Sequence, residues 1–425
     1  MYFLYNILLL IVVILISPFV LVKMVISARW RAGLGERFGF LPPGAKADNS
    51  ILIWAASVGE VRAAALLVKE LNKNFPEAKI VLATMTPEGN RLAKELKLGD
   101  RVIFAPLDFF LCVRRVLASI RPKLFVLVET ELWPNFIKEA KKSGAKIILV
   151  NGRISARSFG KYKAIKDFLK NIFNYFDVIS VREPVDKERL IILGAPPDKV
   201  VVSGNIKYDQ LADDKQALKP SDKSYREFGL KPEALVLVAG STKENEEEII
   251  LKAYRKITEK FTALRLIIAP RHLKRVKEIE NILKQQNFEY IKKTDLGKTA
   301  SVSDKAVILL DTMGELVKAY SLATVAFVGG SLVKTGGQNI MEPASLGKPV
   351  IFGPYMESFW ETALLLKKTG GAVEIKDGEE LAGKVSYFLA NPQVRAAKGE
   401  ELRQAVLSMR GATQRNIELI KKLIG

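Results

Sequence analysis

The sequence is almost without cysteine and histidine, which narrows the chemistry that it can perform. Cys112 and His272 are the only residues of these two types among 425. No intramolecular disulfide can form, so a reducing compartment is expected. One cysteine and one histidine cannot assemble the familiar zinc sites. A carboxylate site for magnesium stays possible, but no Asp-x-Asp pair suggests one, and we predict a site without a metal.

Several recognition motifs are also missing. The Walker spacing G-x-x-x-x-G-K-[ST] is absent and no G-x-G-x-x-G follows an expected strand, so ATP and dinucleotide sites lose their support. Zinc-finger spacings, RNA-recognition signatures and arginine-rich arms are lacking too, which argues against nucleic acid as a partner. The chain nevertheless has a formal net charge of +20. This excess indicates a negatively charged partner, such as an anionic membrane surface or a phosphorylated substrate.

A long uncharged run opens the chain. Residues 2–22 have no charged side chain, and as a helix rising ~1.5 Å per residue they would span about 30 Å, the thickness of a bilayer core. Basic residues follow the run but none precedes it; they are Lys23, Arg29, Arg31 and Arg37. We therefore expect a transmembrane anchor over residues 1–22, with the rest of the chain in the cytoplasm. The alternatives are a cleaved signal peptide and a buried core helix. A signal peptide usually begins with a basic leader, and no basic residue precedes this run.

Beyond the anchor, short apolar runs alternate with amphipathic stretches, the pattern of parallel strands covered on both faces by helices. In the first half we expect strands at residues 51–56, 80–84, 102–104, 124–128, 147–150 and 178–181. In the second half we expect them at residues 235–239, 264–269, 307–310, 325–328 and 350–352. The sequence thus predicts an α/β fold with two Rossmann-like, doubly wound domains facing a cleft. We place the first domain at residues 23–211, a polar linker at 212–221 and the second domain at 222–425.

Acidic residues gather in the loops that follow the expected strands of the first domain. Glu60 ends the segment Ser57-Val58-Gly59-Glu60 and would stand at a helix N-terminus, where an acidic residue also simply favours the helix dipole. The loop at residues 129–135 packs two carboxylates and a tryptophan into seven residues. A glutamate at a strand end in a cleft can be desolvated enough to act as a general base.

Three loops of the second domain suggest a nucleotide site. Gly240-Ser241-Thr242-Lys243 follows the first strand, where backbone N–H groups and a hydroxyl could receive a phosphate. Arg271, beside His272, could face a base or a phosphate. In the glycine-rich stretch 329–343, Asn339 suits a helix start and Glu342 could hold a ribose diol. The alternative for this stretch is a turn that only joins a strand to a helix.

Taken together and in order, these loops resemble the 3-deoxy-D-manno-octulosonic acid (Kdo) transferases of Gram-negative bacteria. The resemblance runs from beyond the anchor to Gly353-Pro354. Its segments are RAGLGER at 31–37, ASVGE at 56–60, ETELWPN at 129–135, GNIKYD at 204–209, DTMGEL at 311–316 and GGQN at 336–339.

The resemblance implies a GT-B glycosyltransferase that is membrane-anchored, metal-independent and inverting and that uses no cofactor. It would transfer Kdo from CMP-Kdo to the lipid A precursor (lipid IVA) in lipopolysaccharide core biosynthesis, at the cytoplasmic face of the inner membrane. Glu60 would be the catalytic base. The residues expected at the cytidine nucleotide are Arg271, Met313 with Gly314, Asn339 and Glu342.

The resemblance also implies roles for other side chains. Glu131 and Lys207 would line the cleft and orient the acceptor or the sugar. For the growing charge of the departing CMP, we expect donors from the loop around Ser241 together with the helix start at Asn339. The chain departs from the family pattern at Lys243 and Tyr355, where the family has histidine. A lysine can still hold phosphate. Two alternatives remain: a GT-B enzyme that uses a UDP-sugar and another membrane lipid, and a tethered nucleotide- or lipid-binding protein without turnover.

Overall fold

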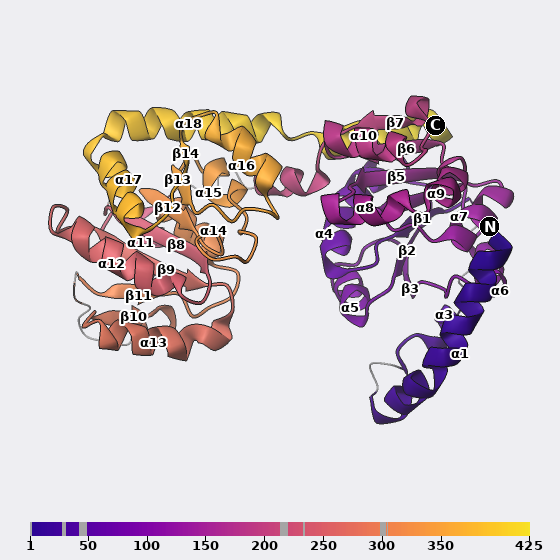
Figure 1. The fold of residues 1–425 in the computed structure, drawn as a ribbon, viewed down its shortest axis with the longest axis horizontal. Helices are drawn as coiled ribbons and strands as arrows, with labels where there is room; N and C mark the ends of the chain where they lie inside the picture. The colour runs from indigo at the N-terminus through magenta and orange to yellow at the C-terminus, as the bar shows by residue number, and fades with distance from the viewer. Residues whose placement is uncertain are drawn as a thin grey trace. The chain divides into compact units, whose positions relative to one another are not determined.

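The protein is described by a computed structural model that covers residues 2–27, 31–41, 49–212, 220–232, 234–297, 303 and 305–425. The chain forms two compact units (Figure 1). Unit 1 comprises Met1–Gln210 together with Arg410–Gly425, and unit 2 comprises Leu211–Met409. Each unit is built on a sheet of seven parallel strands with helices on its faces.

The expected apolar N-terminal segment is a helix. Helix α1 spans Tyr2–Ile26 and is long and apolar enough to cross a membrane, judged by length and composition. A short helix, α3 (Leu34–Arg37), follows it. Of the basic residues expected after the apolar run, Lys23 and Arg31 lie among the described residues near the C-terminal end of α1, whereas Arg29 lies outside the described residues.

The strand order of unit 1 is β3-β2-β1-β4-β5-β6-β7. This is a doubly wound order, in which strands are added on one side of β1 up to β3 and on its other side from β4 onward. The strands are β1 (Ile51–Trp54), β2 (Ile80–Thr84), β3 (Arg101–Phe104), β4 (Leu124–Val128), β5 (Lys146–Gly152), β6 (Val178–Val181) and β7 (Val200–Val202). The helices are α4 (Val58–Asn74), α5 (Pro87–Glu95), α6 (Phe110–Ile120), α7 (Pro134–Lys142), α8 (Ala156–Lys163), α9 (Lys166–Phe173), α10 (Pro184–Ile192) and α19 (Ala412–Ile424), with 3₁₀ turns η1 (Pro197–Lys199) and η2 (Ile206–Ala212).

Unit 2 repeats the same plan in the order β10-β11-β9-β8-β12-β13-β14. Its strands are β8 (Val236–Thr242), β9 (Arg265–Pro270), β10 (Tyr290–Lys292), β11 (Val307–Leu309), β12 (Val325–Val328), β13 (Val350–Phe352) and β14 (Ala372–Glu374). Its helices are α11 (Asp222–Glu227), α12 (Glu246–Thr258), α13 (Val276–Gln285), α14 (Leu316–Leu322), α15 (Met341–Ser345), α16 (Trp360–Lys367), α17 (Gly378–Ala390) and α18 (Pro392–Ser408), with turns η3 (Leu273–Arg275) and η4 (Lys293–Asp295). The expected pair of doubly wound parallel sheets is therefore confirmed.

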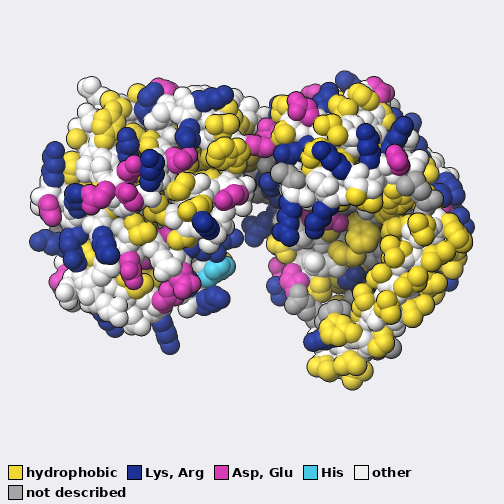
Figure 2. Space-filling model, in the orientation of Figure 1, with side chains coloured by type: hydrophobic (Ala, Val, Ile, Leu, Met, Phe, Trp, Pro, Cys, Tyr) yellow, Lys and Arg dark blue, Asp and Glu magenta, His cyan; other side chains and the backbone are white. Residues whose placement is uncertain are grey.

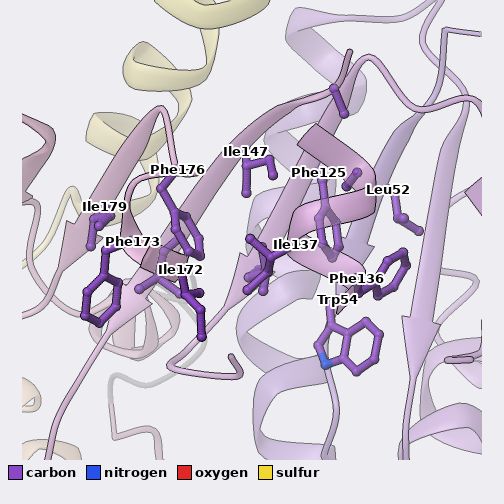
Figure 3. Close-up of a cluster of buried hydrophobic side chains, with 14 of the residues drawn as sticks. Leu52, Trp54, Phe125, Phe136, Ile137, Ile147, Ile172, Phe173, Phe176 and Ile179 are labelled. Atoms are coloured by element: carbon purple, nitrogen blue, oxygen red, sulfur yellow. The ribbon is translucent and has the colours of Figure 1, made fainter. Parts of the chain in front are cut away.

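The core of unit 1 lies on both faces of its sheet because the central strands are buried on both sides. Figure 3 shows one face, where Trp54 and Phe125 of the strands meet Phe136 of α7, and Phe173 of α9 lies beside Ile179 of β6. The other face packs against α4, α5 and α19. In unit 2 one face of the sheet packs against α12, α13 and α17. Fully buried parallel strands are consistent with the continuous apolar runs from which they were predicted.

The last residues of the chain were expected in the second domain, up to residue 425, but they pack in the first unit. Residues 410–425 belong to unit 1, where Ile417 and Ile420 of α19 are buried in the core beside α4. Asp209 in η2 fixes the start of this helix, since its carboxylate accepts hydrogen bonds from the backbone N–H groups of Gly411 (2.7 Å) and Thr413 (2.6 Å). Of the expected linker at 212–221, residues 213–219 lie outside the described residues.

We predict that Ile417→Ala destabilises unit 1. Its side chain is fully buried, and truncating a buried isoleucine costs about 2–5 kcal/mol because a cavity remains. Hydrogen exchange measured by mass spectrometry should show lost protection in α4 and α19, with peptides of β8 unchanged. Glu418→Ala, on the exposed side of the same helix, is the matched control. An equal effect of the two changes, or a loss confined to unit 2, would contradict the packing of α19 on unit 1.

Candidate functional site

In unit 1, the unusual polar residues lie where the strand order reverses. Strands β1 and β4 are paired neighbours, and the chain leaves them in opposite directions toward β2 and β5. The carboxyl ends of two such strands leave a crevice in which doubly wound proteins bind ligands. Glu60 follows β1 and Glu131 follows β4, so two of the three expected site residues of this unit lie at this position in the sheet.

Glu60 is held in the first turn of α4 by two hydrogen bonds to its carboxylate. Ser57, the N-cap of the helix, donates its hydroxyl to Oε1 over 2.8 Å, and the Ala56 N–H donates to Oε2 over 2.7 Å. The side chain is 6% exposed. A carboxylate oxygen can accept two hydrogen bonds, so each oxygen of Glu60 keeps one acceptor position beyond these contacts.

The surroundings of Glu60 adjust its acidity toward neutral pH. The pKa of this carboxyl is raised to about 7, chiefly by burial and also by the negative charges of Glu131 and Glu129, against the lowering effect of the Ser57 and Ala56 hydrogen bonds. A carboxyl group with a pKa near the working pH is suited to general-base catalysis. This combination of burial and neighbouring carboxylates separates Glu60 from an ordinary acidic residue at a helix start.

Glu129, beside Glu131, was not among the expected site residues. Its backbone has a left-handed φ of 63°, which is costly for a non-glycine residue and is often found at functional sites. Its Oε1 lies 2.7 Å from Nη2 of Arg182 and 2.7 Å from Nζ of Lys207. Glu129 directly follows β4, and Arg182 directly follows β6. The rule that functional residues follow the carboxyl ends of parallel strands could therefore have identified both residues.

Lys207, an expected site residue, is brought close to the start of α4. A Cβ atom added to Gly59 would lie 3.7 Å from the Lys207 ammonium nitrogen. The lysine is positioned by η2, in which the neighbouring Ile206 is buried and donates its N–H to Oδ1 of Asn151 over 3.0 Å. Glu60, Glu131 and Lys207 are therefore gathered at one edge of the sheet of unit 1, together with Glu129.

Glu131 is half-buried and hydrogen-bonded to an indole. Trp133 donates from Nε1 to Oε2 of Glu131 over 3.1 Å, and the Trp133 ring packs 5.5 Å from the ring of Trp54 in the core. Burial raises the pKa of Glu131, and the charge of Glu129 also raises it, whereas the indole hydrogen bond lowers it. The loop after β4 thus fixes a second carboxyl of raised pKa near Glu60.

In unit 2, the reversal of strand order falls between β8 and β12, and a buried glutamate joins the two loops there. The carboxylate of Glu246 is fully buried. It accepts hydrogen bonds from four backbone N–H groups: Lys243 (2.9 Å), Gly330 (2.6 Å), Ser331 (2.9 Å) and Leu332 (2.9 Å). One of these donors, the Lys243 N–H, belongs to the loop 240–243 that was expected at a phosphate, and it is engaged by Glu246. The expected phosphate contacts of Ser241 and of the helix start at Asn339 stay predictions.

Side-chain cations remain at this edge of unit 2. Nζ of Lys243 lies 3.2 Å from Nε2 of His272, and the nearby positive charges, chiefly Lys243, lower the pKa of this imidazole. Arg271 is exposed beside them and donates its backbone N–H to the Thr242 carbonyl over 3.0 Å. Ser241 is buried with a left-handed φ of 58°. The loops after β8 and β9 therefore place Lys243, His272 and Arg271 together.

Glu342 and Asn339 form a second pair in the same unit. Nδ2 of Asn339 donates to Oε1 of Glu342 over 3.2 Å, and Oδ1 accepts from the Met341 N–H at the start of α15. Burial raises the pKa of Glu342, while the Asn339 hydrogen bond and the charge of Arg271 lower it. The influence of Arg271 shows that the arginine and this glutamate are close enough to interact.

Met313 and Gly314 lie in the loop after β11, at the same edge of the unit 2 sheet. Met313 is 78% exposed, and Gly314 has a φ of 83°, a conformation that favours glycine. Tyr355 donates its backbone N–H to the Ser331 carbonyl over 3.0 Å and lies under the ammonium of Lys334. Among the residues that the structure describes, no group of three or more His, Cys, Asp or Glu side chains is arranged to hold a metal ion.

Two parallel, doubly wound sheets, each with polar residues where its strand order reverses, define the GT-B class of fold. A UDP-GlcNAc 2-epimerase from Neisseria meningitidis bound to UDP-GlcNAc shares this fold with a TM-score of 0.62 at 16% identity, over 88% of this chain and 100% of that chain.

The chain belongs to the 3-deoxy-D-manno-octulosonic acid transferase family and is a glycosyltransferase. A family model described as 3-Deoxy-D-manno-octulosonic-acid transferase (kdotransferase) matches residues 32–210. The 3-deoxy-D-manno-octulosonic acid transferase of Haemophilus influenzae is 36% identical over 99% of this chain and 98% of its own length. That of Chlamydophila psittaci is 31% identical over 93% of this chain and 90% of its own length.

We predict that Glu60 titrates near pH 7 and that Ser57→Ala raises its pKa further, because the lost hydroxyl bond favoured the charged carboxylate. Carbon-13 NMR of the carboxyl, assigned by comparison with Glu60→Gln, measures both values. Since the folded pKa lies above the unfolded one, the contribution of Glu60 to stability is present below pH 4.5 and is lost as the pH rises through about 7.

Ser57→Thr, which keeps the hydroxyl, is the control for this titration and should leave the pKa nearly unchanged. A Glu60 carboxyl that titrates at its ordinary value of 4.5 would contradict the buried environment described here.

Proposed function

We propose that this Kdo transferase moves Kdo from CMP-Kdo to the lipid A precursor lipid IVA in lipopolysaccharide biosynthesis, with Glu60 as the catalytic base. Family membership supports Kdo as the transferred sugar. The observation on which the assignment of the base depends is the carboxyl of Glu60, buried at the carboxyl end of β1 with a pKa of about 7. At this pKa a substantial fraction is ionised at neutral pH, and proton uptake is still favourable.

The proposed step is a single displacement. Glu60 takes the proton of an acceptor hydroxyl while that oxygen forms a bond to the anomeric carbon of Kdo. The bond from this carbon to the phosphate oxygen breaks on the opposite face, and its electron pair leaves with CMP. The configuration at the anomeric carbon is inverted, and no covalent enzyme intermediate forms.

The departing CMP is a phosphate monoester whose charge grows as the bond breaks. In this proposal the cations of Lys243 and Arg271 stabilise that charge, together with the helix start at Asn339, since the N–H groups of Gly330 and Ser331 are engaged by Glu246. Ser241 adds a hydroxyl beside Lys243. Such fixed charges replace a divalent metal, and the proposed reaction uses none.

The nucleoside is assigned to the neighbouring residues of unit 2. Glu342 accepts hydrogen bonds from the ribose hydroxyls, and Asn339 fixes its orientation through their 3.2 Å hydrogen bond. Met313, largely exposed, covers the cytosine ring, and Gly314 allows the backbone to approach it closely. Tyr355 has no assigned contact with the nucleotide; its backbone N–H bonds to the Ser331 carbonyl and helps to order that loop.

In unit 1, the acceptor and the sugar are assigned to Glu131 and Lys207. The ammonium of Lys207, within 2.7 Å of Glu129 and near Gly59, provides a positive charge for an acidic sugar or for a phosphate of the acceptor. Glu131, with a pKa raised by burial, accepts hydrogen bonds from sugar hydroxyls.

The proposal places the enzyme at the cytoplasmic face of the inner membrane, attached through α1. An apolar helix of 25 residues supports attachment, and the net charge of +20 favours an anionic surface, which gives about 1 kcal/mol per basic residue close to it. A lipid acceptor embedded in the same membrane would then be presented to the enzyme without leaving the bilayer.

We predict that Glu60→Gln lowers kcat about 100- to 10,000-fold, since it keeps the shape but removes the basic oxygen. The assay follows product by mass spectrometry with saturating CMP-Kdo and a tetra-acylated lipid A precursor. CMP binding, measured by calorimetry, should stay unchanged because the nucleotide is assigned to unit 2. Glu70→Gln, on the same helix α4, is the control and should retain activity. Near-normal turnover of Glu60→Gln would refute the assignment of the base.

The second candidate function is transfer from a UDP-sugar, since the epimerase of similar fold binds UDP-GlcNAc. We predict that the enzyme releases CMP from CMP-Kdo, in step with the appearance of Kdo-lipid, and releases no UDP from UDP-sugars. The reactions contain excess EDTA, because the proposed mechanism needs no divalent metal. Release of UDP with a glycolipid product, and none of CMP, would favour the second candidate.

A further inference from the structure

The first turn of α1 is tied to unit 1 by polar contacts. The hydroxyl of Tyr5 donates to Oδ2 of Asp108 over 2.7 Å. Asn6 and Asn135 are joined by reciprocal amide hydrogen bonds of 3.2 and 2.8 Å. The ring of Tyr2 packs edge-on against an aromatic ring of α9 at 5.6 Å. If α1 crossed a bilayer from this end, these groups would lie about 30 Å away, on the far side of the hydrocarbon core.

Asp108 is a firm anchor for this turn. Its carboxylate is buried and also accepts hydrogen bonds from the backbone N–H groups of Asn135 (3.0 Å) and Phe136 (2.8 Å) at the start of α7. Burial raises the pKa of this carboxyl to about 6. Withdrawing Tyr5 would leave a buried carboxylate with one donor fewer, which is costly where water is scarce.

The segment beyond the other end of α1 is attached to the same unit. In α3, the carboxylate of Glu36 accepts a hydrogen bond from the Phe104 N–H, and Arg37 donates to the Met85 carbonyl over 2.7 Å. The guanidinium of Arg37 also lies 4.7 Å from the ring of Phe104. Both the start of α1 and the helix that follows it are therefore fixed to unit 1.

One side of α1 is partly covered while the rest faces outward. The half-covered residues recur every three or four positions near each end of the helix; they are Tyr2, Tyr5, Asn6, Leu9, Ser17, Val20, Lys23 and Met24. The outward residues are strongly exposed, as Phe3 (79%) and Val25 (80%) illustrate. Figure 2 shows this outward side as a continuous hydrophobic band. An apolar surface of this extent requires a partner.

Exposed apolar residues beside the docked turn extend this surface. Phe110 and Leu111 are exposed at the start of α6, two and three residues after Asp108. Phe40 is exposed too, and the guanidinium of Arg115 lies 4.7 Å from its ring. An arginine can lay its apolar stem along such a surface while its guanidinium reaches a lipid phosphate, and the net charge of +20 favours an anionic bilayer as the partner.

We propose that α1 does not cross the bilayer but lies in one leaflet, with its docked first turn and its N-terminus kept on the side of the enzyme. The occupant of its outward face is an anionic lipid bilayer. The inference rests on the proposed membrane attachment but not on the proposed reaction. Its anchors, Asp108 after β3 and Asn135 after β4, lie at the carboxyl edge of the unit 1 sheet, the edge that also holds Glu60.

The test uses labelling from each side of the membrane. In the full chain with Cys112→Ser, a short extension ahead of residue 1 has one cysteine, and a separate variant has Lys422→Cys on the exposed side of α19. A membrane-impermeant maleimide is added to spheroplasts and to inverted vesicles. We expect both cysteines to be labelled only in inverted vesicles. Labelling of the N-terminal cysteine in spheroplasts would overturn the proposal, whatever the outcome of the activity assays.

A second measurement reports docking directly. Asn6→Cys and Asn135→Cys are combined in the Cys112→Ser chain and treated, in native membranes, with a short bifunctional thiol reagent. We expect an intramolecular cross-link that shifts the electrophoretic mobility. The pair Asn6→Cys and Ala118→Cys, whose second member is exposed at the far end of α6, is the control and should not be joined. Absence of the first cross-link in membrane-bound protein would overturn the docked arrangement.

Discussion

One glutamate occupies the same position in the sheet of each unit, and the number of hydrogen bonds that its carboxylate accepts differs between the two. Glu60 and Glu246 both lie in the first turn of the helix that follows the first strand of their sheet, where the strand order reverses. Glu246 accepts four backbone hydrogen bonds, two on each oxygen, which fills its acceptor positions and joins two loops. Glu60 accepts one on each oxygen and keeps room for a proton. The same position in the fold therefore gives a structural carboxylate in unit 2 and a candidate base in unit 1.

The central strands could be predicted because burial on both faces requires uninterrupted apolar residues. Strands such as β2, β4 and β12 have the predicted bounds. The strands β7, β10 and β14 were missed because each has only three residues and lies at a sheet edge. The return of α19 to unit 1 was also missed. Its apolar residues recur at the spacing of any amphipathic helix, and this spacing contains no information about which sheet they cover.

For the candidate site, motifs identified residues but not their partners. Glu131 and Lys207 could be selected because they stand in recognisable segments. Glu129 stands in the same segment as Glu131, but its left-handed backbone and its two ion pairs are visible only in the structure. Glu246 was overlooked because an acidic residue at a helix start is usually explained by the helix dipole. Some of the four donors lie more than 80 positions away in the sequence. Local sequence patterns do not predict contacts over such separations.

The same limit applies to α1, and it bears on how a lipid acceptor reaches the enzyme. Composition predicts an apolar helix, but the partners of Tyr5 and Asn6 are 103 and 129 positions away, so only the structure reveals the docked turn. Asp108 follows β3, and Asn135 lies in the first turn of α7, directly after the β4 loop that holds Glu131. In the proposed arrangement, a helix fixed there would set the depth of that sheet edge relative to the lipid surface. The sugar of the proposed lipid acceptor would then approach Glu60 without the lipid being withdrawn from the membrane.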